Sequence, residues 1–391
     1  MTLPDRIQFS KIEGIGNDFI VIDCRNAGHV TDRALSCQLG TSLYPPHLDI
    51  PALCDRRTGI GANGVVFIHD SATDADAKMV IFNSDNSRPE ICGNGLRCVV
   101  LHLFSLSTPQ GSPKRRQASQ LTVETDAGPL CCIIEPKTEA LRSDDTQRCN
   151  NSLPAQAAKV SIEMPAAHVI PPPPGYEEKR SIEHGGCSVT VQCQNSGDGD
   201  RVFSGTLVNI GNPHFIYFTT EADNISSYAD LIRFAKIWGP LIESHHAFPK
   251  RINVSFVRSE WLASDNVRRT TRSIDAVVYE RGAGLTEACG SGACAIAAAS
   301  HNSHIQRGHE IDAVADNPRE WNIRLPGGLL TITTMPRVQQ TNTPVRGNAD
   351  TVTPAFIIKM TGPARYAYQG SFLRSMYATP QKLTDGPQDH G

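Results

Sequence analysis

The sequence predicts an α+β fold built from two similar domains. Many short apolar runs alternate with glycine and proline, which is typical of a chain with many strands and few helices. Two short motifs also recur in the same order at nearly the same spacing, which is typical of a duplicated domain. The 391 residues are enough for two domains with their own cores.

Short apolar runs bounded by turn residues predict the strands. They lie at residues 19–23, 64–68, 78–82, 206–210, 215–218, 274–279 and 329–333. Two patterns predict helices. Between residues 96 and 104, apolar residues recur at intervals of three and four, and an alanine-rich run covers residues 293–299. The small side chains of that run would let a helix pack closely against strands.

The internal repeat is the most informative feature of the sequence. Ile15-Gly16-Asn17 recurs as Ile210-Gly211-Asn212, 195 residues later, and Cys92-Gly-Asn-Gly95 recurs as Cys289-Gly-Ser-Gly292, 197 residues later. Each half of the chain therefore carries one Ile-Gly-Asn turn and one Cys-Gly-x-Gly turn. Residues 107–120, 136–154 and 334–353 are polar segments that we interpret as insertions, and the prolines at 171–174 predict a stiff spacer.

Composition excludes several classes of function. A net charge of -3 over this length favours neither nucleic acid nor an anionic membrane as a partner, and the basic cluster at 114–116 is expected to be a solvated loop. No apolar run approaches the ~20 residues of a membrane span, and the N-terminus has no signal-peptide pattern, so we expect a cytosolic protein. In that compartment most of the 12 cysteines should be free thiols.

The two Cys-Gly-x-Gly turns predict proton transfer at a carbon atom. Each turn precedes a helical pattern, so its cysteine lies at a helix N-terminus, where backbone N–H groups bind anions and lower a thiol pKa. Two such thiols on opposite faces of an α-carbon could remove and return its proton. This chemistry needs no cofactor, and no pyridoxal-binding lysine motif stands out. Cys92 and Cys98, like Cys289 and Cys294, are too far apart for a zinc knuckle.

A series of motifs in this order resembles diaminopimelate epimerase, a family of pyridoxal-independent amino-acid racemases. They run from residues 9–19 and 55–61 through 82–85, 92–98, 211–214 and 251–253 to 280–294, 325–328 and 360–364. The resemblance implies two domains, each a barrel-like strand set around a central helix, with the active site in the cleft between them. The implied domains are residues 1–158, to which 361–391 return, and residues 159–360.

The resemblance also implies roles for individual residues. Cys92 and Cys289 would be the acid/base pair that interconverts LL- and meso-diaminopimelate. The residues that match substrate-binding positions are Asn17, Asn83, Gly93, Asn94, Asn212, Asn253, Glu280, Arg281, Gly290 and Ser291. Among them the glycine-turn residues would hold the reacting carboxylate, and Glu280 with Arg281 would recognise the far end of the substrate. His214 would lie beside the site.

The sequence departs from the family in a few places and leaves alternatives open. Asn63 stands where the family usually has aspartate, Asp85-Asn-Ser87 replaces Asp-Gly-Ser, and compact family members lack the three insertions. A racemase of another amino acid, such as histidine or a proline derivative, and a phenazine-biosynthesis-like isomerase both stay open. A third alternative, a binding protein without activity, would be expected to lack one thiol or the turns that hold the carboxylate, and the sequence retains both. We expect a small-molecule amino-acid partner, no nucleic acid and no membrane, and a homodimer stays open.

Overall fold

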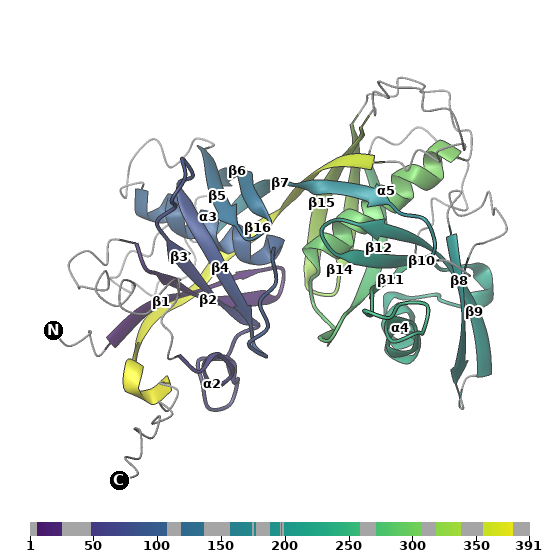
Figure 1. Cartoon of the computed structure of the whole chain (residues 1–391), viewed down its shortest axis with the longest axis horizontal. Helices are drawn as coiled ribbons and strands as arrows, with labels where there is room; N and C mark the ends of the chain where they lie inside the picture. Colours follow the sequence, from purple (N-terminus) through teal and green to yellow (C-terminus); the bar gives the residue numbers. More distant parts are fainter. Residues whose placement is uncertain are drawn as a thin grey trace, which may run out of the picture.

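The computed structural model describes most of the chain. The described residues are 6–25, 48–107, 119–136, 157–173, 176, 188–195, 197, 199–258, 271–306, 318–337 and 355–377. The greater part of each predicted insertion, and the basic cluster at 114–116, lie outside these residues. Figure 1 shows the chain folded into two lobes of strands, each with a helix among them.

The two lobes repeat one order of elements. The first repeat consists of β1 (Arg6–Gly14), β2 (Asn17–Asp23), β3 (Gly64–His69), β4 (Ala77–Asn83), α3 (Gly93–Ser107), β5 (Ser119–Thr125), β6 (Gly128–Pro136) and β7 (Ala157–Val169). The second consists of β9 (Gly199–Asn209), β10 (Pro213–Phe218), β11 (Asn253–Arg258), β12 (Thr271–Glu280), α5 (Gly290–Gln306), β14 (Arg319–Leu325), β15 (Gly328–Pro336) and β16 (Ala355–Leu373). The remaining elements are α2 (Ile50–Cys54), β8 (Ser188–Asn195), α4 (Tyr228–Glu243), β13 (Gly284–Leu285) and two short 3-10 helices.

Strand pairing follows the same pattern in both repeats. β1 and β2 are antiparallel, β2 and β3 parallel, and β3 and β4 antiparallel; β9 to β12 pair in the same way. The strand register is also the same in the two repeats. Phe19 pairs with Gly64 in the first repeat, and His214 pairs with Asn253 at the equivalent place in the second. The predicted α+β fold with two similar strand-and-helix units is confirmed, although each strand set is ring-like rather than a strict barrel.

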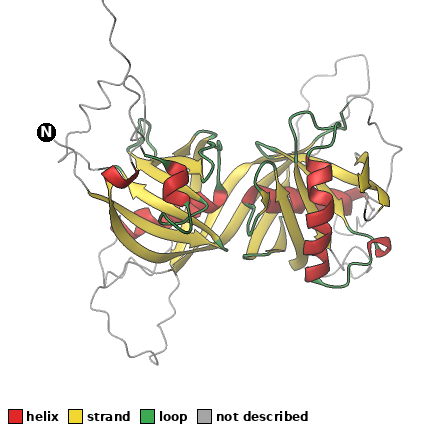
Figure 2. Cartoon of the chain, turned by 90° about the horizontal axis from the view of Figure 1, so that it is seen from below, coloured by secondary structure: helices red, strands yellow, loops and turns green. Residues whose placement is uncertain are grey.

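Two long strands join the repeats. β7 pairs with β6 through residues such as Ile162 and with β9 at His168 and Val169. β16 pairs with β15 up to Thr361 and with β1 from Arg365 onward. Figure 2 shows these strands running from one lobe into the other. Because both strands pair with strands of both repeats, the domain limits at 158 and 360 stay a prediction.

The central helices α3 and α5 lie in one hydrophobic core that draws side chains from both repeats. α3 contributes large residues such as Leu96 and Val100, whereas α5 contributes the run of buried alanines from Ala293 to Ala299. Side chains this small allow strands and a second helix to approach closely. The sequence prediction of both helices is therefore confirmed, with the apolar face of α3 as expected.

Helix α4 was missed by the sequence analysis. Its apolar residues Leu231, Phe234, Ala235, Trp238 and Ile242 recur at helical intervals and are buried in a second core. Ser227 caps its N-terminus together with Asp230, but Pro240 lies inside the last turns and hides the pattern. Among the described residues, no helix has the length and apolar character needed to cross a membrane.

Candidate active site

The two Cys-Gly-x-Gly turns occupy equivalent places in the fold. Cys92 directly precedes α3 and Cys289 directly precedes α5. In each turn the backbone N–H three residues later donates to the sulfur, from Gly95 to Cys92 Sγ at 3.4 Å and from Gly292 to Cys289 Sγ at 3.3 Å. Each thiol is thus held against the first turn of a central helix. Cys92 is partly exposed, and Cys289 is buried.

Both turns pack against the same side chain, Met360 of β16. A Cβ atom on Gly93 would lie 2.5 Å from Met360 Cε, and one on Gly290 would lie 3.1 Å from Met360 Sδ. Neither position has room for a larger residue without movement of the methionine. The first glycine of each turn therefore brings the two helix N-termini together around Met360.

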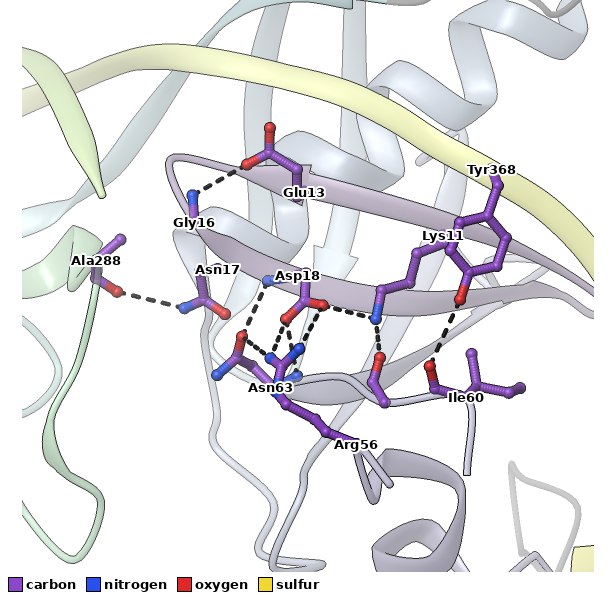
Figure 3. Close-up of polar contacts among 11 residues, drawn as sticks. Lys11, Glu13, Gly16, Asn17, Asp18, Arg56, Ile60, Asn63, Ala288 and Tyr368 are labelled. Atoms are coloured by element: carbon purple, nitrogen blue, oxygen red, sulfur yellow. Dashed lines mark hydrogen bonds and ion pairs between the residues drawn. The ribbon is translucent and has the colours of Figure 1, made fainter. Parts of the chain in front are cut away.

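Side chains of the first repeat reach the turn of the second repeat. Asn17 Nδ2 and Asn94 Nδ2 both donate to the backbone oxygen of Ala288, at 3.3 and 3.0 Å, immediately before Cys289. Figure 3 shows the contact of Asn17. The Oδ1 atoms of both asparagines are buried and have no hydrogen-bond partner among the described residues. These two acceptors are well placed to receive a substrate ammonium.

Asn212 and His214 lie beside the second turn. Asn212 Nδ2 donates to Ser291 Oγ at 3.4 Å, and its Oδ1 lies 3.1 Å from His214 Nε2. Burial, followed by the nearby Arg281 charge, lowers the pKa of His214 to about 3. The imidazole is therefore neutral at physiological pH. With Oδ1 as acceptor, its proton is on Nε2, which leaves the buried Nδ1 as an acceptor with no partner in the described part of the chain.

Asn253 and Arg281 form the outer part of this group. Asn253 Oδ1 accepts from the Arg281 backbone N–H at 2.9 Å, and Asn253 Nδ2 donates to Pro213 O at 3.1 Å. The Arg281 side chain is exposed and donates to Lys250 O at 3.4 Å. Within the described residues its guanidinium has no carboxylate in ion-pair contact. It is thus free to bind a carboxylate of a ligand.

Glu280 ends β12, and its charge acts on both thiols. Its Oε1 accepts from Thr286 Oγ1 at 2.5 Å, and its negative charge adds to the effect of burial in raising the pKa of the Cys289 thiol. Burial raises the pKa of Glu280. The electrostatic effect of Glu280 on Cys289 has no local sequence signal, since the two residues are nine positions apart and are separated by the turn after β12.

Asn83 ends β4 and is held locally. Its side chain donates to Ser87 Oγ at 2.9 Å, and Ser87 Oγ in turn donates to Asp85 Oδ1 at 2.6 Å. Asn86 adopts a positive φ of 67° in this turn, which asparagine tolerates well. The altered Asp85-Asn86-Ser87 sequence therefore forms a tight turn that leads towards Cys92.

The prediction that the helix N-termini lower the thiol pKa values is wrong. Burial raises the pKa of both thiols, and that of Cys289 rises well above its ordinary value. The N–H donors of Gly95 and Gly292 oppose this effect, but loss of water outweighs them. Among the described residues, no group of three His, Cys, Asp or Glu side chains could hold a metal ion.

A network that the sequence analysis missed supports the first Ile-Gly-Asn turn (Figure 3). Asp18 forms ion pairs with the buried Lys11 and with Arg56, each at 2.6 Å. Asn63 Oδ1 accepts from Arg56 Nη2 at 3.1 Å and from the Asp18 backbone N–H at 3.2 Å. Asparagine at position 63 thus keeps an acceptor there without adding a second negative charge.

Known proteins share both the sequence and the fold. The chain matches the diaminopimelate epimerase family over residues 9–148 and 206–352. It is 31% identical to the diaminopimelate epimerase of Desulforudis audaxviator (strain MP104C), over 94% of this chain and all of that protein. It is 32% identical to that of Synechococcus sp. (strain JA-2-3B'a(2-13)), over 94% of this chain and 99% of that protein.

Two solved structures share the fold at low sequence identity. A hydroxyproline epimerase from Agrobacterium vitis, with bound trans-4-hydroxy-L-proline, has a TM-score of 0.56 at 13% identity and covers 95% of this chain and 92% of its own. A probable proline racemase from Agrobacterium radiobacter K84 has a TM-score of 0.54 at 13% identity and covers 93% and 92%. From its sequence relatives, the chain belongs to the diaminopimelate epimerase family and is an isomerase.

Proposed function

We propose that this enzyme interconverts LL- and meso-diaminopimelate, with Cys92 and Cys289 as the two acid/base groups. The observation that carries the proposal is the pair of equivalent turns. Each sulfur accepts an N–H at the start of a central helix, and both turns pack on Met360. Two acid/base groups in related positions are what inversion of a carbon atom requires, because the proton must leave one face and return to the other.

Each turnover needs one cysteine as the thiolate and the other as the thiol, so that protons balance. The thiolate on one face takes the α-proton, and the thiol on the other face gives its own proton to the resulting carbanion. The two cysteines have then exchanged roles, and the enzyme is ready for the reverse reaction. No proton is gained or lost overall, and the reaction needs no oxidant or cofactor.

The carbanion must be stabilised as it forms. The first N–H groups of α3 and α5 have no partner within their helices, and the two helix N-termini lie on either side of Met360. Preorganised donors of this kind stabilise negative charge that develops on a carboxylate, typically by several kcal/mol. We assign this role to the backbone of Gly93, Asn94, Gly290 and Ser291.

The remaining site residues suit a substrate with two charged ends. Asn17, Asn94 and His214 present buried acceptor atoms that lack a partner in the described structure. Arg281 presents an exposed guanidinium beside Asn253, and we assign it to the distal carboxylate of the substrate. Two further asparagines complete the proposed substrate-binding set. Asn83 is the last residue of β4, and Asn212 ends the turn before β10.

The test is a substrate panel. Purified enzyme is incubated with LL-diaminopimelate, L-lysine, L-proline, trans-4-hydroxy-L-proline and L-histidine, and the stereoisomers are separated by chiral chromatography. We expect meso-diaminopimelate to form rapidly from the first compound, with only slow inversion of L-lysine and no inversion of the other three. Inversion of another amino acid in place of diaminopimelate would show that the proposed substrate is wrong but that the enzyme is still a racemase. Absence of inversion throughout would contradict the proposal.

A further inference from the structure

The guanidinium of Arg281 depends on the backbone around it for its position. Arg281 begins the turn between β12 and β13, and its exposed side chain donates to the backbone oxygen of Lys250 at 3.4 Å, which is long for such a bond. A weak contact of this kind does not fix a long side chain. The place of the guanidinium is therefore set by two backbone segments, the turn at 281–283 and the loop at 248–252.

Glu243, the last residue of α4, bonds to both of these segments. Its Oε1 accepts from the Gly282 N–H at 3.1 Å and from Arg251 Nη1 at 3.3 Å, and its backbone oxygen accepts from the Ile252 N–H at 3.3 Å. Its side chain is only 7% exposed, so water has little access to replace these donors. One residue of α4 therefore joins the turn that carries Arg281 to the loop that Arg281 contacts.

A second contact on the same face of α4 acts on the same strand. Gly239 precedes Glu243 by four residues, so both lie on one side of the helix. A Cβ on Gly239 would lie 2.7 Å from Tyr279 Cδ2, and Tyr279 is two residues before Arg281. The glycine thus lets β12 approach the helix closely. α4 holds the chain on both sides of Arg281, by packing at Tyr279 and by hydrogen bonding at Gly282.

The loop before β11 has a strained backbone that needs support. Arg251 has a positive φ of 57°, which is uncommon for a residue of its type. Its N–H donates to Phe248 O at 2.8 Å, and its guanidinium bonds to Glu243. Such a conformation persists only where surrounding contacts hold it. Loss of the Glu243 carboxylate would therefore loosen the loop that leads to Asn253, whose Oδ1 accepts from the Arg281 N–H.

We propose that Glu243 is a positioning residue, which fixes the turn after β12 so that Arg281 presents its guanidinium to the distal carboxylate of the substrate. The proposal rests on the proposed function, in which Arg281 binds that carboxylate. The carboxylate of Glu243 is occupied by the Gly282 N–H and by Arg251, so it acts on the substrate only through Arg281. It thereby favours substrates that have a distal carboxylate and leaves proton transfer at the α-carbon unaffected.

The kinetic test compares diaminopimelate with lysine, which lacks the distal carboxylate. We expect Glu243→Ala to lower kcat/KM for diaminopimelate by about tenfold to a hundredfold, mainly through KM, because a displaced guanidinium binds the substrate less well. Slow deuterium exchange at the α-carbon of lysine should survive. Glu243→Gln keeps an oxygen acceptor for the Gly282 N–H and should restore the rate. Ser227→Ala removes the cap at the other end of α4 and controls for a general loss of helix stability; it should keep kcat/KM.

A double variant shows whether Glu243 acts through Arg281. In Arg281→Met the guanidinium is already absent, so adding Glu243→Ala should lower kcat/KM for diaminopimelate by no more than about a further twofold. A further loss of about tenfold in the double variant would overturn the proposal. An equal loss of lysine exchange in the single variant Glu243→Ala would overturn it as well, because Glu243 would then support the whole site.

Hydrogen–deuterium exchange of the substrate-free enzyme tests the positioning independently of the substrate. Peptides that contain residues 281–284 should exchange severalfold faster in Glu243→Ala than in the wild type, whereas peptides that contain 83–87, at the equivalent strand end of the first repeat, should not change. Unchanged exchange at 281–284 would overturn the proposal. Failure of the wild type on diaminopimelate, with faster exchange in the variant, would contradict the proposed function but retain the positioning of Arg281. If Glu243→Ala does not fold, Glu243→Asp, one methylene shorter, should change both measurements in the same direction.

Discussion

The two Ile-Gly-Asn turns share a sequence but not a conformation. In the first repeat Ile15 and Gly16 both have positive φ, 50° and 81°, and the turn is pressed against the second repeat: a Cβ on Gly327 would lie 1.8 Å from Ile15 O. In the second repeat only Gly211 has positive φ, 92°, and a Cβ there would meet nothing within 4 Å. A β-branched residue at positive φ is strained and persists only where its surroundings hold it.

The difference shows how a duplicated fold becomes asymmetric. The first turn serves as a contact between the repeats, since Asn17 bonds to Ala288 and a Cβ on Gly16 would lie 3.2 Å from Glu287 Cβ. The second turn hydrogen-bonds within its own repeat, from Asn212 to Ser291. The first turn is therefore packed against the second repeat, whereas the exposed Arg281 is linked to the second turn through Asn253 and Pro213. We infer that the distal end of the substrate lies on the side of the second turn.

Cys92 and Cys289 should have equivalent roles in the two repeats, and removing either thiol should have the largest effect on epimerisation. We expect Cys92→Ala and Cys289→Ala each to reduce epimerisation by on the order of 10³-fold, because each removes one of two acid/base groups. Initial rates of meso-diaminopimelate formation measure this. Cys131→Ala, at another partly exposed cysteine, is the matched control and should keep its activity. Near-normal turnover by either active-site variant would contradict the two-thiol mechanism.

The two repeats should differ in substrate binding, because Arg281 of the second repeat is assigned to the distal carboxylate. We expect Arg281→Met to lower kcat/KM for diaminopimelate by about 30-fold to several thousand-fold, because a charged carboxylate loses its partner. The control is Arg324→Met, which removes an arginine that pairs with Asp275 on the surface and should change little. Slow deuterium exchange at the α-carbon of lysine should survive in Arg281→Met. An equal loss of exchange on lysine would make Arg281 a structural residue.

The close contact at Gly327 should be sensitive to one added methyl group. Gly327→Ala must displace the backbone of Ile15, so we expect a loss of about 1–3 kcal/mol in the free energy of unfolding. Gly211→Ala meets no atom and should cost only the roughly 1 kcal/mol of an alanine at positive φ. Urea denaturation of both variants measures the difference. Equal losses would show that the first turn is no more constrained than the second.

The sequence predicted the features that depend on local pattern. The strands, the two central helices and the duplication follow from apolar runs and repeated motifs, and they place Cys92 and Cys289 at helix N-termini. Contacts between residues that are far apart in the sequence could not be predicted from it. The packing of Met360 between Gly93 and Gly290 and the ion pairs of Asp18 have no local signal. Burial was also underestimated, which is why the thiol pKa prediction was wrong.

His214 should have its effect on the pH dependence of stability rather than on stability at neutral pH. Its pKa falls from 6.5 to about 3 on folding, so the unfolded chain binds a proton that the folded chain does not. Stability is therefore full above pH 6.5 and falls as the pH drops towards about 3, by up to roughly 1.4 kcal/mol per pH unit. We expect His214→Gln to flatten this slope between about pH 4 and 6. The exposed His246→Gln should leave the slope as it is.

The central claim is that two groups act on opposite faces of one carbon. The most direct measurement is the reaction of LL-diaminopimelate in deuterated water, followed by mass spectrometry of both isomers at early times. We expect meso-diaminopimelate to carry one solvent deuterium at the inverted carbon while the remaining LL-isomer carries none. A single group acting on both faces would return the substrate's own hydrogen or label the remaining substrate. Product that retains its original hydrogen would contradict the account.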